Sequence, residues 1–152
     1  ILLASLLLFA VPMYEKSRAN VVKPTLQGEI VNVTVMEVWE MLNNEEDGKE
    51  TVVDVRTFSE YFNERIATPH IYDKPILYPL QFIEIPFFAK LFIILFEGKK
   101  VILYCRTAHR SYIAANILIS QGWQGKIYNM VGGITAWKEA GLPTVKKFGF
   151  GR

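Results

Sequence analysis

Short strand-like segments alternate with helix-like segments along most of this 152-residue chain. Two of the strand-like segments, 51–55 (TVVDV) and 100–104 (KVILY), are apolar at successive positions instead of every second one. Strands of this kind are buried on both sides, which is typical of a parallel sheet with helices packed on each face. The sequence therefore predicts an α/β fold with a central parallel β-sheet and helices on both faces.

The boundaries of these elements follow from periodicity and capping patterns. We expect strands at 29–33, 51–55, 100–104 and 126–130, and helices at 35–42, 58–63, 111–121 and 134–140. Thr34 and Glu37 form a capping-box pattern at the first helix, and Gly132-Gly133 marks a tight turn. In such folds chemistry collects beyond the carboxyl ends of the parallel strands, so the residues after 104 are the first candidates for a site.

Charge and cysteine content exclude several classes of function. The chain carries 17 basic and 15 acidic residues, and a net charge of +2 gives no electrostatic basis for binding nucleic acid. A single cysteine excludes an intrachain disulfide, and with only two histidines, His70 and His109, the chain lacks the ligands of a Cys/His zinc site. We therefore expect no metal and no cofactor.

The first apolar segment is 1–13 (ILLASLLLFAVPM), which contains no charged residue. It is shorter than the roughly 20 residues that cross a bilayer and has the length of a signal-peptide core or of part of a membrane anchor. An apolar helix docked on the domain is the alternative. Residues 14–28 are expected to be a linker. We expect a membrane-associated or exported protein, with the extracytoplasmic (periplasmic) side favoured.

The second apolar segment is 75–96, whose only charges are Glu84 and Lys90. Prolines at 75, 79 and 86 exclude a transmembrane helix over this segment, although 89–96 fits a short helix. One interpretation is that the segment belongs to the core of the domain. The other is an exposed apolar patch that contacts a membrane or a protein partner, and the apolar segment 1–13 favours membrane contact.

The only cysteine, Cys105, follows the predicted strand 100–104 and precedes a helix. The loop between them reads Cys-Arg-Thr-Ala-His-Arg-Ser over 105–111. A helix amino terminus supplies inward-pointing N–H groups and about half a positive charge, and Arg106 and Arg110 add two full charges. Such surroundings lower a thiol pKa, so the loop predicts a thiolate in an anion-binding cradle. The alternative is a buried structural cysteine.

Three groups of residues resemble those of the single-domain rhodanese-like sulfurtransferases, and the resemblance covers about residues 29–145. Residues 146–152 are expected to be a C-terminal tail. The three groups are Val53-Asp54-Val55-Arg56 with Glu60-Tyr61, Cys105 to Ser111, and Gly132-Gly133-Ile134-Thr135-Ala136-Trp137 with Gly141-Leu142-Pro143. The resemblance implies a rhodanese-like α/β domain and a catalytic Cys105 that carries a persulfide. Sulfane sulfur would pass from a small sulfur-containing substrate, thiosulfate or a persulfide, to a thiophilic acceptor.

Further roles follow from the resemblance and from the loop. The substrate-binding residues are expected to be Arg106, Thr107, Ala108, His109, Arg110 and Ser111. Asp54 and Arg56 are expected to hold loops through an ion pair, with Glu60 as a further participant. Four residues separate Cys105 from Arg110, whereas related cell-cycle phosphatases have five. The smaller loop favours sulfur transfer over phosphatase or arsenate-reductase chemistry. The alternative function is a non-catalytic or sulfur-carrying module that associates through 75–96.

Two departures from the family pattern concern the loop and the connection before it. Ala108 stands where many members have glycine, and a positive φ there would cost about 1 kcal/mol. The family's usual Gly-His-Ile run is replaced by Glu64-Arg65-Ile66, which a long apolar connection follows. The sequence indicates no partner for His70.

Overall fold

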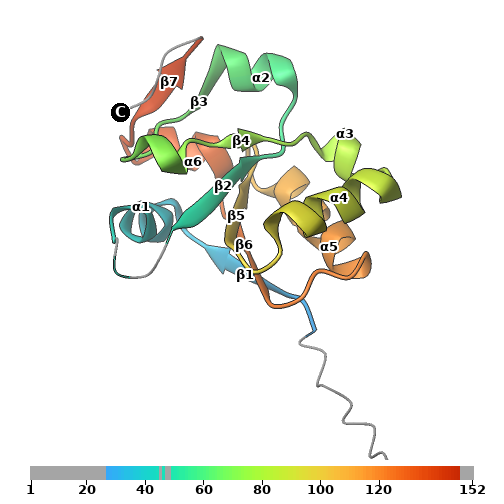
Figure 1. Ribbon diagram of the computed structural model, residues 1–152. Helices are drawn as coiled ribbons and strands as arrows, with labels where there is room; N and C mark the ends of the chain where they lie inside the picture. Colours follow the sequence, from blue (N-terminus) through green and yellow to red (C-terminus); the bar gives the residue numbers. More distant parts are fainter. Residues whose placement is uncertain (1–26, 45, 47–48, 148–152) are drawn as a thin grey trace, which may run out of the picture.

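The computed structural model describes residues 27–44, 46 and 49–147. Its centre is a five-stranded sheet with parallel neighbours and the strand order β1-β6-β5-β2-β4 (Figure 1). The strands are β1 (Glu29–Val33), β2 (Glu50–Asp54), β4 (Ile76–Leu77), β5 (Lys100–Tyr104) and β6 (Lys126–Met130). Two short strands, β3 (Glu64–Ile66) and β7 (Thr144–Lys146), form a separate antiparallel pair.

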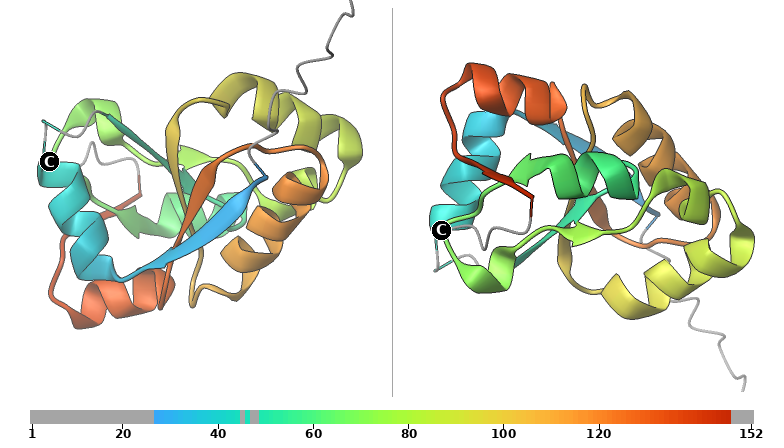
Figure 2. Two further views of the ribbon diagram at one scale, coloured as in Figure 1. Left: turned by 90° about the horizontal axis from the view of Figure 1, so that it is seen from below. Right: turned by 90° about the horizontal axis from the view of Figure 1, so that it is seen from above.

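Helices cover both faces of the sheet, as the sequence predicts (Figure 2). One face packs against α1 (Val35–Asn43) and α6 (Gly133–Glu139), and the other against α3 (Leu80–Ile83), α4 (Pro86–Phe96) and α5 (His109–Ser120). The described residues also form helix α2 (Phe58–Asn63) and the 3-10 turn η2 (Ile71–Asp73).

The two cores explain why the strands are apolar at successive positions. Val52 and Ile102 pack with α1 and α6, whereas their neighbours Val53 and Leu103 pack with α4 and α5. All four side chains are at most 1% exposed. Successive residues of a strand point to opposite faces, so a sheet covered on both faces needs apolar residues at every position.

Local sequence signals locate most elements to within two residues. The expected helix 58–63 and the strands 29–33, 100–104 and 126–130 match the structure, and Thr34 and Glu37 form the expected capping box. The helix expected at 111–121 begins earlier, at His109, and the strand expected at 51–55 runs one residue earlier, from Glu50. The strands β3, β4 and β7 were not expected.

The structure describes only residues 27–28 of the expected linker and 146–147 of the expected tail. Gln27, placed in the expected linker, forms an antiparallel bridge with Gln124. Lys146, placed in the expected tail, pairs with Glu64 as the last residue of β7. The apolar segment 1–13 and most of the linker lie outside the described residues.

The segment 75–96 folds into β4, α3 and α4, and it supplies both core and surface. The core receives Leu80, Ile83, Ala89, Phe92, Ile93 and Phe96. In contrast, Phe87 is 70% exposed and Ile94 is 77% exposed. Within the part of the chain that the structure describes, no helix is both long and apolar enough to cross a membrane.

Candidate active site

The loop from Cys105 to Ala108 turns directly from β5 into α5, at the carboxyl end of the sheet. The Cys105 side chain is buried, and the N–H of Ala108 donates a hydrogen bond to its Sγ atom at 3.2 Å. The Ser111 hydroxyl lies 3.6 Å from the same sulfur. The loop therefore directs hydrogen-bond donors at the cysteine sulfur.

These donors decide the ionisation of Cys105. Burial favours the neutral thiol, but hydrogen bonds from the backbone and the hydroxyl of Ser111 and from the backbones of Thr107 and Ala108 outweigh it, so the pKa of Cys105 lies below its ordinary value. The amino terminus of α5 adds favourable dipole charge at the same place. A buried structural cysteine would have a raised pKa, so this geometry favours the reactive-thiol interpretation.

Ala108 allows the loop to turn towards the sulfur. Its backbone is left-handed, with φ of 86° and ψ of −8°, and no side chain caps α5 there. Residues other than glycine reach this conformation at a cost of about 1 kcal/mol. The positive φ that would make alanine costly at this position is therefore present. The strain is stored in the residue whose N–H contacts the sulfur.

A chain of polar side chains leads from Cys105 through the buried Ser111 and Asn129 to the exposed Asn32. The Ser111 hydroxyl lies 2.7 Å from Asn129 Oδ1, and Asn129 Nδ2 donates to Asn32 Oδ1 at 2.9 Å. Asn32 and Asn129 are register partners on β1 and β6. Neither asparagine was expected from the sequence, although each occupies the fourth position of a strand that is otherwise largely apolar. They orient the hydroxyl group that contacts the thiol.

The Gly132-Gly133 turn supports the loop from the other side. The N–H groups of Ile134 and Thr135 donate to the carbonyls of Cys105 and Arg106 at 2.9 and 3.1 Å. Gly133 has φ of 57°, and a Cβ atom there would collide with both of those carbonyls. The role of Gly133 is thus close backbone approach to the cysteine loop as well as turning, and only the turn was expected from the sequence.

Glu60 pairs with Arg110 and does not join Asp54 and Arg56, so that part of the expectation is wrong. Arg110 donates to both Glu60 carboxylate oxygens, at 2.6 and 2.7 Å. These hydrogen bonds lower the pKa of Glu60 to about 2 and raise that of Arg110. The Cys105 thiolate also raises the pKa of Arg110, because its negative charge favours the guanidinium. The pair fixes one cation beside the sulfur.

Asp54 and Arg56 form the expected ion pair, which is buried. Arg56 Nη2 lies 2.6 Å from Asp54 Oδ2 and also donates to the carbonyl of Glu64 at 2.7 Å. The Tyr104 hydroxyl donates to the same carboxylate at 2.6 Å. Burial raises the pKa of Tyr104, so the phenol remains a donor. The network joins the ends of β2 and β5 to β3. These hydrogen bonds hold the strands together and do not include Cys105.

A cavity of about 350 Å³ opens beside the sulfur. Its lining consists of Glu60, Cys105, Arg106, Thr107, His109 and Arg110. Arg106 and His109 are exposed at its rim. A neighbouring cavity of about 470 Å³ shares Glu60 and Arg106 and extends along α6 to Lys138. The loop therefore presents a buried sulfur to a cavity that is open to solutes and carries two arginines.

His70 lies apart from this site. Its Nδ1 atom is 2.9 Å from Asp73 Oδ2, and its ring stacks on Tyr72. The partner that the sequence did not indicate is thus local, three residues along the chain. Among the residues that the structure describes, no cluster of three or more His, Cys, Asp or Glu side chains could hold a metal ion.

Comparison with known proteins agrees with this fold and shows the family. A family model for the rhodanese-like domain matches residues 34–140. A protein of Allochromatium vinosum named sulfurtransferase is 37% identical over 95 residues, covering 62% of this chain and 77% of the relative. The uncharacterised protein slr1261 of Synechocystis is 38% identical over 95 residues, but this chain spans only 46% of its length.

Solved structures show the same architecture. A rhodanese-related protein from Thermoplasma volcanium has a TM-score of 0.57 at 26% identity, covering 75% of this chain and 96% of that one. Alr3790 of Anabaena has a TM-score of 0.59 at 19% identity, covering 76% and 81%, and shares the fold. The chain therefore belongs to the rhodanese-like domain family, and its relatives support membership of the sulfurtransferase family.

Proposed function

We propose that this protein moves sulfane sulfur through a persulfide on Cys105, taking it from a donor such as thiosulfate or a persulfide. The observation that carries the proposal is the lowered pKa of a buried thiol that faces an open cavity with Arg106 and Arg110 in its lining. The thiolate is the nucleophilic form of cysteine, and an anionic donor would be attracted to the two guanidinium groups.

The first step is a displacement at sulfur. The Cys105 thiolate attacks the outer sulfur of thiosulfate, a bond forms between the two sulfurs, and the original sulfur–sulfur bond breaks. Sulfite leaves with the electron pair of that bond, and Cys105 retains an anionic persulfide. The N–H of Ala108 and the Ser111 hydroxyl, which contact Sγ, favour negative charge at this end of the loop.

The second step returns the enzyme to its starting state. A thiophilic acceptor, such as cyanide in an assay or a cellular thiolate, attacks the outer sulfur and takes it. The bond to Sγ breaks, its electron pair stays on Sγ, and the thiolate is restored, so the cycle needs no external oxidant. Because Arg110 is already paired with Glu60, Arg106 is the better candidate to hold the donor's charge.

Mass spectrometry and turnover test the proposal together. Incubation of the protein with thiosulfate should add one sulfur atom to Cys105, and cyanide should remove it as thiocyanate. Cys105→Ser should abolish both the adduct and the turnover, whereas Arg106→Ala should raise KM for thiosulfate about tenfold. No sulfur adduct with either thiosulfate or a low-molecular-weight persulfide would refute the proposal, and hydrolysis of an aryl phosphate would redirect it to phosphatase chemistry.

A sulfur-carrying module without turnover is the second candidate, and the strained Ala108 favours it. A left-handed alanine replaces the residue best suited to that conformation in the loop that contacts the sulfur. This candidate predicts a stoichiometric sulfur adduct on Cys105 that acceptors remove slowly. A turnover rate above that of free thiol under the same conditions would exclude it.

A further inference from the structure

Helix α4 is apolar on two opposite sides. The side that faces the sheet contributes Ala89, Phe92, Ile93 and Phe96 to the core. Phe87 and Ile94, seven residues apart and thus two turns along the same side, point away from it and are 70% and 77% exposed. A surface helix of a globular domain has one apolar stripe. The second stripe on α4 therefore needs an explanation.

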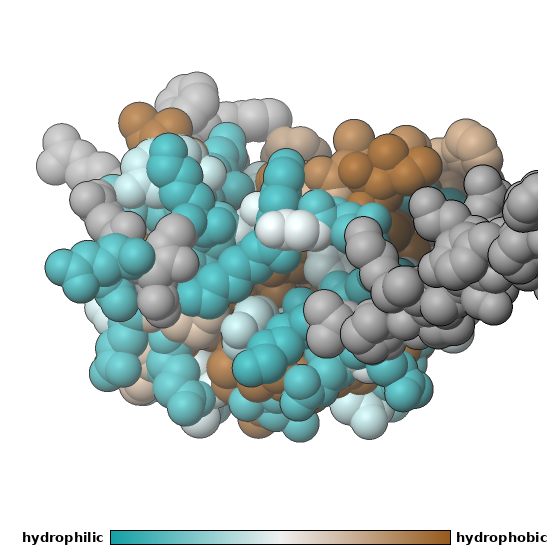
Figure 3. Space-filling model, turned by 60° about the horizontal axis from the view of Figure 1, so that its bottom comes forward, coloured by the Kyte–Doolittle hydropathy of each residue, from teal (hydrophilic) through white to brown (hydrophobic). Residues whose placement is uncertain are grey.

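The exposed stripe is part of a larger surface, here called the α4 patch. It consists of Phe82, Ile85, Phe87, Ile94 and Leu95, which are 37–77% exposed. Figure 3 shows apolar side chains gathered on the side where Figure 1 places α3 and α4. Lys90 is the only charged residue of α4 and is exposed, whereas Glu84 and Glu97 lie just outside its two ends. Aromatic and long aliphatic residues with a lysine beside them are typical of helices that lie in a membrane interface.

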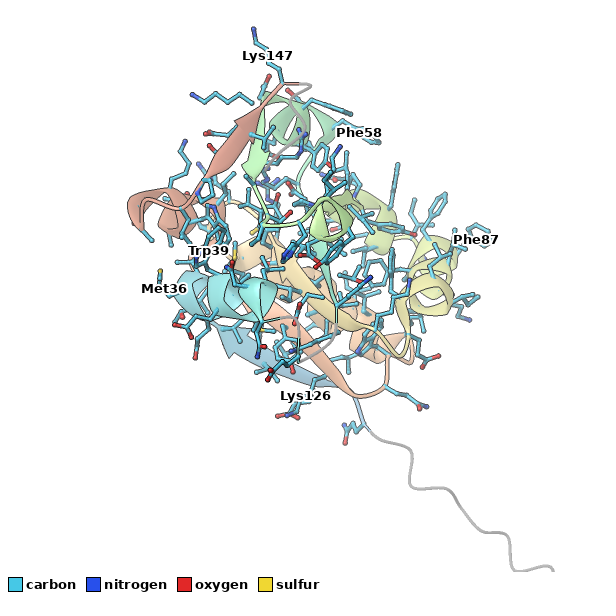
Figure 4. The ribbon with its side chains drawn as sticks, turned by 60° about the vertical axis from the view of Figure 1, so that its left-hand side comes forward. Met36, Trp39, Phe58, Phe87, Lys126 and Lys147 are labelled. Carbon is cyan, nitrogen blue, oxygen red and sulfur yellow. The ribbon has the colours of Figure 1, made fainter. Side chains whose placement is uncertain are left out.

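The described part of the chain begins at Gln27, at the same edge of the sheet at which α4 ends. The parallel strands β1, β6 and β5 all begin at this edge, where Gln27 bridges Gln124 and where Lys126 lies in Figure 4. Helix α4 reaches the edge through 97–99, which lead into β5. Residues 14–26 can span up to about 45 Å, and α4 is only about 16 Å long. Both apolar elements can therefore touch one surface.

We propose that the α4 patch rests on a lipid bilayer into which residues 1–13 of the same chain insert. Each element alone is a weak membrane signal, and stable attachment generally takes two. Tethering by one element raises the effective concentration of the other at the surface. The acyl and headgroup region accepts the aromatic stripe, and Lys90 can extend its ammonium group to the lipid phosphates.

This arrangement leaves the cavity at Cys105 open to solutes. Phe82 of the patch contacts Phe58 of α2, with 6.2 Å between the ring centroids. Neither of these residues, and no other member of the patch, lines the cavity at Cys105. The proposal is therefore independent of the sulfur chemistry, and either can fail without the other.

Vesicle partitioning of the full chain tests the proposal. The double variant Phe87→Asp with Ile94→Asp should bind mixed phosphatidylcholine–phosphatidylglycerol vesicles at least tenfold more weakly than the wild type. Met36→Asp is the matched control, because Met36 is 47% exposed and lies on the opposite side of the molecule in Figure 4. It should bind like the wild type, and all three proteins should keep the same reactivity of Cys105.

Three results would overturn the proposal. They are absence of vesicle binding by the wild type, equal binding by the double variant, and a dimer in sedimentation velocity that the double variant loses. The last would assign the patch to a second copy of the chain. Phe87→Gln with Ile94→Gln should give the same loss of binding as the aspartate pair. This second pair introduces no charge and keeps the test valid if the aspartates disturb folding.

Discussion

Two pairs of helices in this protein begin in opposite ways. Helices α1 and α2 start after Thr34 and Thr57, each with a complete capping box that satisfies the first N–H groups by side chains. Helices α5 and α6 start after Ala108 and Gly132, both left-handed and without a side-chain cap. At α5 a backbone N–H contacts the Cys105 sulfur, and at α6 the N–H groups hold the cysteine loop.

The difference shows how the site obtains its donors. A helix amino terminus always has unpaired N–H groups, and a capping side chain would satisfy them locally. Where the cap is missing, the same groups become available for a sulfur atom or for the neighbouring backbone. Glu60 links the two kinds of start, because it completes the capping box of α2 and also pairs with Arg110 of α5.

The largest loss of stability should come from a substitution at the uncapped start of α6. Gly133→Ala places a Cβ against the Cys105 and Arg106 carbonyls in a backbone with φ of 57°, and should lower the free energy of unfolding by about 2–4 kcal/mol. It should also shift the loop and raise the thiol pKa. Urea denaturation and the pH dependence of alkylation measure the two effects.

Gly141→Ala is the control for this prediction, since Gly141 has φ of 72° but no atom within 4 Å of the place where the new methyl group would lie. It should show the backbone strain of about 1 kcal/mol alone and leave the thiol unchanged. Equal losses at the two glycines would mean that the contact with the cysteine loop contributes nothing.

The uncapped start of α5 should respond next most strongly. Ser111→Ala removes the hydroxyl that contacts Sγ and leaves Asn129 Oδ1 without this donor, at a cost of about 1–3 kcal/mol in stability. The thiol pKa should rise by up to about one unit. Ser120→Ala, on the exposed end of the same helix, should change neither quantity noticeably. An unchanged thiol pKa in Ser111→Ala would show that the Ser111 hydroxyl does not stabilise the Cys105 thiolate.

A capped helix should behave differently from both. Thr34→Ala should destabilise the protein by about 1 kcal/mol, because α1 loses the side-chain hydroxyl of its capping box. Cys105 should keep its alkylation profile, since α1 is not part of its cavity. A thiol pKa that moved with this substitution would contradict the separation between capped and uncapped helix starts.

A small gain in the free energy of unfolding is expected when Ala108 is replaced by glycine. Ala108→Gly relieves a left-handed alanine and should raise the free energy of unfolding by about 0.5–1 kcal/mol while preserving the loop. In contrast, Ala140→Gly, at a right-handed position with φ of −73°, should lower it. Thermal unfolding of the two variants gives the comparison, and destabilisation by both would show that Ala108 is unstrained.

The weakest effect should be the pH dependence of the stability that the Glu60–Arg110 pair contributes. The pKa of Glu60 is about 2 in the folded protein against an ordinary 4.5, so its contribution is fully present above pH 4.5 and is lost as the pH falls towards 2. The pair is partly exposed, which limits this contribution to about 0.2–1 kcal/mol. The stability difference between wild type and Glu60→Gln should be constant near neutral pH and should vanish in acid.

Local signals predicted much of the fold and the position of the site. The strands β1, β5 and β6, both Thr-initiated helices and the Cys105 loop depend on residues within a few positions of one another. The antiparallel pair β3–β7 was missed, because two three-residue strands about 80 positions apart show no detectable period. The partner of Glu60 was also wrong, because Arg110 lies 50 residues away and Arg56 is closer in sequence.

The sequence by itself determined that two-sided apolar strands must be covered on both faces, and that a lone thiol lies between a strand and a helix start. Only the tertiary structure decided what surrounds that thiol. The approach of Gly133 to the loop, the pairing of Asn32 with Asn129 and the ion pair of Glu60 each join segments that meet through packing of the sheet and its helices. Hydrogen bonds and close contacts depend on distances in space, which the order of residues along the chain does not specify.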